Sequence, residues 1–428
     1  MLSTYLFTRE TGLTNPRELR SAQLARQYTS LVRSELRYFP SRHSGTVNCL
    51  AVDNTEQTFM LSGGSDSRIL LWDLNSREGQ RHRYVLKGSI PAKQGHRYGI
   101  SGLLWWPFDS GMAVTCSFDE TVKIWDTQSL DEVYAFSLGM RVNAIDVSQV
   151  AEHCLVACAA DCPPIRLLDL RSSASAQMLT GHQGPTVQVV KWSPIDPFML
   201  ASGGADGTVR LWDIRRTNAC LTVMNLENMH GGYGTSMPYS REAFSTPQTS
   251  LLENIKSHRG VVNSLAWLAD GRQLVSAGTD EMIRVWDVSG SPSLMQSRDT
   301  NTLVNFGPTV RNRYLQCINM VLSPVQDCFP QILCFPSDTG EILMFNVATG
   351  RLIRRLSISA NTTTVKRTRG LVFRGSEYVE LYSGNSDGDI ILWEAPRHGG
   401  QRHKRTTASA SDRKSNILTE IYKGLEVT

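Results

Sequence analysis

Short stretches in which apolar and polar residues alternate recur along most of the chain, separated by tight-turn signals. The clearest copy is LASGGADGTVRLWDIRR at residues 200–216, in which two alternating stretches flank a Gly- and Asp-containing turn and the second ends on Trp-Asp. Alternation with a period of two predicts strands with one buried face, and the intervening Gly and Asp residues predict a hairpin. The pattern therefore predicts an all-β fold.

Seven related copies of this hairpin indicate a repeat architecture. Their turn aspartates are Asp66, Asp119, Asp161, Asp206, Asp280, Asp338 and Asp387. A Trp position follows each turn by six residues, or by seven in the third and sixth copies, where Leu168 and Phe345 replace Trp. Such spacing fits four-stranded blades with insertions. The copies resemble the WD-repeat family over residues 43–395, and the resemblance implies a seven-bladed WD-repeat β-propeller, with the propeller domain at 34–395.

The two ends of this region predict how the ring closes. After Trp393 the sequence EAPRHGGQRHKR shows no apolar alternation, so the last blade lacks an outer strand. Residues 34–40, SELRYFP, have strand character, and we expect them to supply that strand and remove the open edges. Residues 396–428 are basic and poor in apolar residues, which predicts a disordered tail. Its pairs Lys404-Arg405 and Arg413-Lys414 fit a nuclear-import signal and a solvated tail equally well.

Four copies also carry a histidine and a hydroxyl residue at fixed distances from the turn Asp and the Trp. The four sets are His43, Ser62, Asp66 and Trp72; His96, Thr115, Asp119 and Trp125; His182, Ser202, Asp206 and Trp212; and His258, Ser276, Asp280 and Trp286. One such trio could act as nucleophile, base and orienting group, but four equivalent triads around one ring would serve no catalytic purpose. The resemblance to WD repeats implies a structural network that satisfies buried polar groups.

Composition narrows the remaining functions. The 428 residues include nine cysteines at irregular spacing, which predicts reduced thiols in an intracellular protein. No apolar run is long enough to span a membrane, and no Walker-type, HExxH or GxSxG motif occurs, so we expect a non-catalytic chain without cofactor or metal. Basic ends and an acidic-leaning middle argue against direct sequence-specific binding of nucleic acid.

Residues 1–33 predict a helical arm before the propeller. Asn15, Pro16 and Glu18 are typical of a helix start, and apolar residues follow at helical spacing. One interpretation packs the arm on its own propeller. We favour binding to a groove on a partner protein, since a propeller needs no such cover. The expected anchors are Tyr5, Leu6, Leu24, Tyr28 and Leu31.

Arginines follow two of the repeats at the same position. The fourth copy ends in Trp212, Asp213 and Arg215, and the third has Asp169 and Arg171 in the corresponding places. Such an ending resembles that of WD-repeat receptors that dock on the large damaged-DNA-binding adaptor of cullin-four RING ubiquitin ligases. The resemblance implies that Arg171, Asp213 and Arg215 contact this adaptor together with the arm.

Several further segments keep an order that is similar to the Cockayne syndrome group A family, over residues 1–395. They are TRETGL, MLSGGSD, DSGM, HCLVA, WDIRR and NTLVNFG. This resemblance implies a nuclear substrate-recognition subunit of a cullin-four ligase in transcription-coupled nucleotide excision repair, with the Cockayne syndrome group B ATPase and stalled RNA polymerase II as partners. The basic tail and the insertion at 229–250 depart from it. The alternative is a non-catalytic WD-repeat scaffold of a nuclear or chromatin complex.

Basic and aromatic side chains recur in the loops that lead into the innermost strands. In a propeller these loops open on the face that holds the structural histidines, and together they would form a basic collar. The collar residues are Arg97, Tyr98, Arg141, Arg259, Arg313, Tyr314, Lys366 and Arg367. We expect the collar to bind an acidic or mixed-charge segment of a repair partner, because a local excess of charge attracts its opposite. Solvated loop charges are the alternative.

Overall fold

The computed structural model describes residues 16–79, 82–92, 94–217, 219–226, 256–289, 301–357, 366–375 and 378–396. Contacts divide the chain into a unit at Met1–Ala395 and a unit at Pro396–Thr428. Several expectations therefore fall outside the described residues: the anchors Tyr5 and Leu6, the insertion at 229–250 and the tail from residue 397. Among the helices of the described part, none has the length and apolar character needed to cross a membrane.

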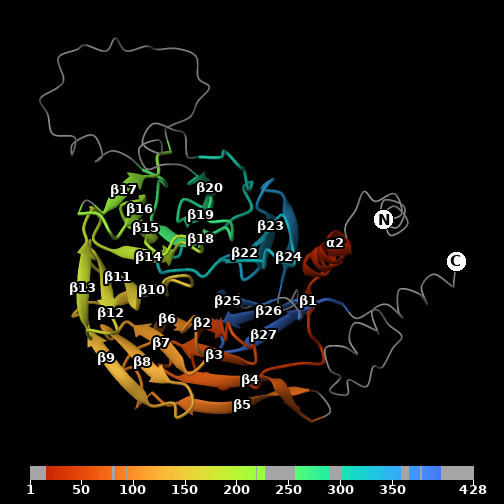
Figure 1. Ribbon diagram of the computed structural model, residues 1–428. Coiled ribbons are helices and arrows are strands. Elements are labelled where there is room, and N and C mark those ends of the chain that lie inside the picture. The colour runs from red at the N-terminus through yellow and green to blue at the C-terminus, as the bar shows by residue number, and fades with distance from the viewer. Residues whose placement is uncertain are drawn as a thin grey trace, which may run out of the picture. The chain divides into compact units, whose positions relative to one another are not determined.

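The larger unit is a β-propeller of seven sheets, as the repeats predicted (Figure 1). Blade 1 contains β2 (Val47–Val52), β3 (Phe59–Gly64), β4 (Ile69–Glu78) and β5 (Arg83–Ile90). Blade 2 contains β6 (Ile100–Trp105), β7 (Met112–Ser117), β8 (Thr121–Asp126) and β9 (Glu132–Ser137). Blade 3 contains β10 (Val142–Val147), β11 (Leu155–Ala160), β12 (Ile165–Asp169) and β13 (Ala174–Leu179).

The remaining blades repeat this order with two variations. Blade 4 contains β14 (Val187–Trp192), β15 (Met199–Gly204), β16 (Val209–Asp213) and β17 (Cys220–Val223). Blade 5 contains β18 (Val262–Trp267), β19 (Gln273–Gly278) and β20 (Ile283–Asp287). Blade 6 contains β21 (Val321–Leu322), β22 (Ile332–Pro336), β23 (Ile342–Asn346) and β24 (Leu352–Leu356). Blade 7 contains β25 (Thr368–Arg374), β26 (Glu380–Asn385) and β27 (Ile390–Glu394). Asn301 bridges Trp286 at the outer position of blade 5.

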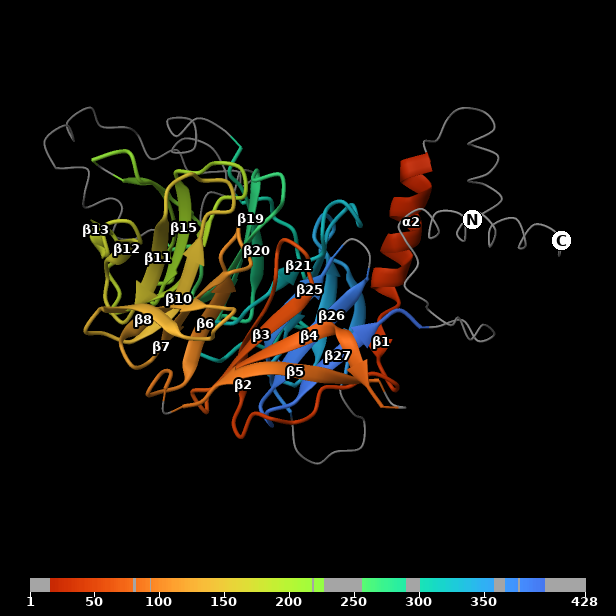
Figure 2. The ribbon, with the colours of Figure 1, turned by 60° about the horizontal axis from the view of Figure 1, so that its bottom comes forward.

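The innermost strands of neighbouring blades contact one another in six of the seven cases, with β25 of blade 7 beside β2 of blade 1 (Figures 1 and 2). Between blades 5 and 6 the Ile318 backbone N–H, shortly before β21, donates to Asn263 O and completes the ring. Six of these strands carry a one-residue bulge at their second position, and the bulge residues are Asn48, Ser101, Asn143, Gln188, Asn263 and Arg369. Asn48, Asn143 and Asn263 donate side-chain hydrogen bonds to Ile100 O, Val187 O and Tyr314 O of the following blade, at 2.8, 3.0 and 2.6 Å. Neighbouring blades are thus joined by polar contacts at the channel.

Glycines before the turns of blades 1 and 4 lie where the next blade packs closely. A Cβ added to Gly203 would lie 2.6 Å from Val262 Cγ1 of blade 5, and one on Gly63 would lie 2.9 Å from Ile100 Cγ2 of blade 2. Both distances are shorter than van der Waals contact, so a larger side chain would push two blades apart. The Ser-Gly-Gly sequences before two of the turns therefore serve packing between blades.

The closing strand lies earlier than residues 34–40, and that expectation is wrong. β1 (Val32–Arg33) pairs antiparallel with β27, with Val32 opposite Glu394. Residues 34–40 instead cross from blade 7 to blade 1, and Phe39 stacks on Tyr84 with ring centroids 4.2 Å apart. Their strand-like pattern arises because Arg37 and Phe39 are buried between the blades while Leu36 and Tyr38 are exposed. Contacts between blades, rather than a strand ladder, produce this alternation.

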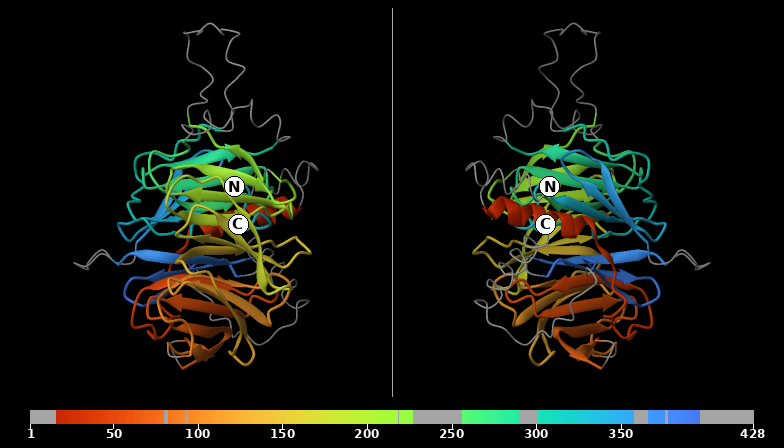
Figure 3. Two further views of the ribbon diagram at one scale, coloured as in Figure 1. Left: turned by 90° about the vertical axis from the view of Figure 1, so that its left-hand side faces the viewer. Right: turned by 90° about the vertical axis from the view of Figure 1, so that its right-hand side faces the viewer.

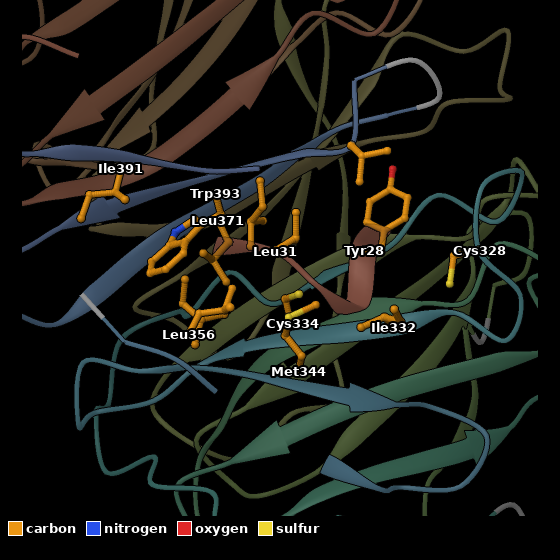
Figure 4. Close-up of a cluster of buried hydrophobic side chains, with 13 residues drawn as sticks. Tyr28, Leu31, Cys328, Ile332, Cys334, Met344, Leu356, Leu371, Ile391 and Trp393 are labelled. Atoms are coloured by element: carbon orange, nitrogen blue, oxygen red, sulfur yellow. The ribbon is translucent and has the colours of Figure 1, made fainter. Parts of the chain in front are cut away.

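Helix α2 (Pro16–Thr29) packs on the propeller of its own chain (Figures 2, 3 and 4). Tyr28 and Leu31 are 0% exposed in a cluster that includes Cys334, Leu371 and Trp393 of blades 6 and 7. Leu24 packs against the same cluster and is partly buried. The expectation that these three side chains anchor a partner is therefore wrong. An apolar stripe on a helix does not specify its groove, and here the groove belongs to the same chain.

Candidate interaction surfaces

The structure brings each of the four Ser/Thr, His, Asp and Trp sets together in the same arrangement. In blade 2, His96 Nδ1 lies 2.9 Å from Asp119 Oδ2, and His96 Nε2 lies 2.7 Å from Thr115 Oγ1. Trp125 Nε1 donates to the same Thr115 oxygen at 2.8 Å. Equivalent contacts join the members of the sets in blades 1, 4 and 5.

These networks bury the groups that a catalytic triad would have to expose. The hydroxyl residues Ser62, Thr115, Ser202 and Ser276 are 0% exposed. A neutral histidine that donates from Nδ1 to the Asp accepts the hydroxyl proton at Nε2, and the hydroxyl oxygen accepts from Trp. Each hydroxyl thus uses its donor on histidine and its acceptor on tryptophan, so the set has a structural role.

Burial and hydrogen bonding shift the pKa values of the histidine and the aspartate in the networks of blades 4 and 5. Burial lowers the pKa of His182 and His258, and their contacts with Asp206 and Asp280 only partly offset this effect. Burial alone would raise the pKa of Asp206, but hydrogen bonds from His182 and backbone N–H groups outweigh it and lower that pKa. The networks of blades 4 and 5 therefore favour neutral histidine beside ionised aspartate.

Arg215 lies on the face opposite to these histidines. The first and third strands of a blade run parallel, so Arg215, which follows the third strand, lies at the end away from the loops that precede the first. Arg215 Nε and Nη2 donate to Asp213 Oδ1 and Oδ2, each at 3.0 Å, and the guanidinium lies 4.7 Å from the Phe198 ring centroid. Its side chain is 57% exposed, so the fork is held in place while one edge faces solvent.

Arg171 is oriented differently, although its position in blade 3 corresponds to that of Arg215. Its Nη2 donates to Glu152 O at 3.2 Å, and Asp169 Oδ1 accepts from the Arg171 backbone N–H. The sequence-based grouping of Arg171 with Asp213 and Arg215 therefore joins residues whose local geometry differs. Of these two arginines, only Arg215 has its guanidinium held by a carboxylate of the described residues.

The collar residues precede the innermost strands, on the histidine face. Tyr98 is 64% exposed, and Arg97, Arg141, Arg259 and Arg367 are exposed as well. None of these four arginines forms an ion pair within the described part of the chain. Two other members are partly neutralised: Arg313 Nε lies 2.7 Å from Glu281 Oε1, and Lys366 Nζ lies 2.9 Å from Asp387 Oδ2.

Sequence reasoning missed one member of this surface. Arg369 lies over the Tyr314 ring, with its guanidinium carbon 4.0 Å from the ring centroid. It occupies the bulge position at which blades 1 to 5 have Asn, Ser or Gln. Alignment of the repeats on the bulge rather than on the turn Asp would have shown this difference.

Comparison with known proteins supports the WD-repeat fold and shows similarity to proteins whose names indicate different functions. The family described as WD domain, G-beta repeat matches residues 34–73, 88–126, 174–213 and 249–287. WD repeat-containing protein ATCSA-1 of Arabidopsis thaliana is 28% identical, over 90% of this chain and 93% of its own. Radiation-sensitive protein 28 of Saccharomyces cerevisiae is 28% identical, over 61% of this chain and 51% of its own. Ribosome biogenesis protein WDR12 homolog of Caenorhabditis briggsae is 29% identical, over 42% of this chain and 44% of its own.

The fold and repeats define this chain as a WD-repeat β-propeller protein. The closer assignment to the Cockayne syndrome group A family is wrong on these comparisons, because proteins named for ribosome biogenesis recur among the similar sequences of several species. Five of the six segments on which that assignment depended lie in the described part of the chain, within blade strands or in the turns and connections beside them. Propellers with different functions can share such segments, since blade packing constrains them.

Proposed function

We propose that the chain is a non-catalytic scaffold of a nuclear multiprotein complex and contacts different partners through its two opposite faces. The observation that carries this proposal is the arrangement of Arg215 and the collar. Both are exposed, both are built on the rigid blades, and they lie at opposite ends of the strands. A rigid body with two separate polar surfaces can hold two partners at a fixed distance.

Two further observations support the proposal. The Ser/Thr, His and Asp sets that suggest chemistry are buried and occupied by structural hydrogen bonds. Relatives with the printed names Ribosome biogenesis protein WDR12 homolog and Ribosome biogenesis protein ytm1 match 41% to 57% of this chain. We therefore propose that the complex takes part in preribosomal assembly. On this proposal the chain is a nuclear protein.

Affinity purification of the tagged full chain from nuclear extract tests this function. We expect recovery of a stable complex of several subunits that contains ribosome-assembly proteins. A chain that stays outside the nucleus or elutes alone would contradict the proposal. Recovery of a cullin-four ligase with its damaged-DNA-binding adaptor would replace the scaffold by a substrate receptor.

Variants on each face separate the two contacts. Arg215→Ala should remove one set of subunits from the purified complex, whereas Arg216→Ala should have a smaller effect, because Arg216 lies 3.5 Å from Asp213 and lacks the two-point contact. Combined Arg97→Glu, Arg259→Glu and Arg313→Glu changes should remove another set. If both variants remove the same subunits, the two faces do not act separately.

A further inference from the structure

The bulge residues around the channel mouth are short and polar in blades 1 to 5, and three of their asparagines bond to the following blade. Blade 7 departs from this pattern. Its bulge residue is Arg369, which reaches back to blade 6 and contacts Tyr314 and Gln316. A long cation thus occupies a place where blades 1, 3 and 5 have an asparagine that joins two blades.

The contacts of Arg369 hold its guanidinium in position beside Tyr314. The group lies 4.0 Å from the centroid of the Tyr314 ring. Arg369 Nη1 donates to Gln316 Oε1 at 3.2 Å, and the Tyr314 hydroxyl donates to the same oxygen at 2.5 Å. The backbone of Tyr314 is held in turn, because Asn263 Nδ2 donates to its carbonyl oxygen at 2.6 Å. An aromatic face and one amide oxygen therefore orient this cation in advance.

Most donors of this guanidinium are still available to a ligand. Arginine carries five N–H donors, and only one of them has a hydrogen-bond acceptor among the described residues. A planar group with free paired donors binds a carboxylate through two parallel hydrogen bonds. Because stacking on Tyr314 limits the motion of the side chain, little conformational entropy remains to be lost on binding.

The surroundings favour a peptide rather than a polyanion. Glu281 and Asp387 lie on the same face and pair with Arg313 and Lys366, so carboxylates interrupt the positive charge. A nucleic acid, with a charge on every phosphate, would meet these carboxylates unfavourably. Leu315, next to Tyr314, is 62% exposed and offers an apolar contact beside the cation.

We infer that Arg369 and Tyr314 bind the carboxylate of an acidic residue in an extended segment of a partner protein, with a neighbouring apolar side chain of that segment against Leu315. This inference rests on the proposed scaffold function, since the segment belongs to another subunit of the complex. It adds to that function one binding site, formed by Arg369 and Tyr314, and the type of partner residue that this site binds.

Immobilised octapeptides provide the test. Each peptide contains one Asp or Glu beside a Leu, Ile or Phe, and is paired with an otherwise identical peptide that carries Asn or Gln. The full-length chain should retain the acidic member of a pair about tenfold better than the amide member, which is the effect of one charge-assisted contact. Arg369→Gln should abolish that preference, and Arg171→Gln on the opposite face should preserve it.

Three results would overturn the inference. The first is a wild-type chain without preference for the acidic peptides, and the second is an Arg369→Gln variant that keeps the preference. The third is a 12-nucleotide RNA that displaces the peptides and itself depends on Arg369, which would assign the site to nucleic acid. Thermal melting of Arg369→Gln checks that its fold is intact, and Tyr314→Leu should weaken the preference without changing the charge.

Failure of this inference and failure of the proposed function have different signatures. If Arg369→Gln loses peptide binding but the chain purifies from nuclei without partners, the scaffold function is wrong and the carboxylate site stands. If the complex is recovered and the peptides show no dependence on Arg369, the scaffold function stands and the site is wrong.

Discussion

The Tyr28 hydroxyl donates a hydrogen bond of 2.9 Å to Asp327 Oδ2, a residue 299 positions later in the chain. This contact joins helix α2 to the loop between β21 and β22 of blade 6. The Tyr28 ring also meets Phe373 of blade 7 edge to face, with centroids 5.6 Å apart. The helix thus ties the beginning of the described chain to its last two blades.

Removal of this tie should destabilise the propeller itself. Tyr28→Phe deletes the donor to a carboxylate that is 2% exposed, and we expect a loss of about 1 to 3 kcal/mol in the free energy of unfolding. Tyr28→Ala also empties the ring's volume in the core and should cost about 3 to 5 kcal/mol. Urea unfolding measures both, with exposed Gln27→Ala as the control. Unchanged stability of Tyr28→Ala would mean that the helix does not pack on its own propeller in solution.

Arg37 makes a second connection across the closure of the ring. It forms ion pairs with Glu380 and Glu394 of blade 7 and is 5% exposed. Arg37→Met should lower the free energy of unfolding by about 3 to 5 kcal/mol, because it removes the cation that two carboxylates share in a buried site. The ion pair that Glu380 then keeps among the described residues is the longer one of 3.4 Å with Arg374.

Two controls define the role of Arg37. Arg37→Lys keeps the charge but lacks the planar fork, so it should recover only part of the stability. Arg42→Ala, at an exposed position a few residues later, should have little effect on chemical denaturation. Equal midpoints for Arg37→Met and Arg42→Ala would rule out a stabilising role for the buried pairs.

The repeats made the propeller predictable, because each blade encodes its own strands and turn within a short segment of the chain, and four blades also encode the hydrogen-bond set. Contacts between distant segments were not predictable in the same way. The apolar stripe that contains Leu24 and Tyr28 suits a partner's groove as well as a groove of the same chain. Arg369 meets Tyr314 only because two blades are neighbours, and neither residue carries a motif.

The hydroxyl at the centre of each Ser/Thr, His, Asp and Trp network should contribute to the stability of the folded propeller. Ser202 Oγ contacts His182 Nε2 and accepts from Trp212 Nε1, each at 2.7 Å. Ser202→Ala leaves two buried nitrogens without their partner and should cost about 1 to 3 kcal/mol by thermal or urea unfolding. The equivalent position in blade 3 is Cys158, which lies opposite Arg166 as Ser202 lies opposite Arg210, and Leu168 replaces Trp in this blade. Cys158→Ser, which places a buried hydroxyl there without such partners, should destabilise as well; a gain in stability would contradict this account.

Acidification should destabilise the propeller in two steps. The pKa values of His182 and His258 are lowered by burial in the folded chain, so the unfolded chain binds more protons below its histidine pKa of about 6.5. Stability is therefore fully present above that pH and falls as the pH drops below it. The lowered pKa values of Asp119, Asp206 and Asp280 add a second loss below a pH of about 4, where unfolded carboxylates take up protons.

Melting temperatures between pH 8 and pH 3 measure both steps. A double variant with His182→Gln and His258→Gln should be less stable at neutral pH, yet its melting temperature should change less between pH 7 and pH 5 than that of the wild type, because two of the groups that take up protons on unfolding are gone. Its loss below pH 4 should persist, since the aspartates in the other blades remain hydrogen-bonded. A wild-type melting temperature that rises from pH 7 to pH 5 would show that the folded histidines bind protons more tightly than the unfolded ones, contrary to the burial argument.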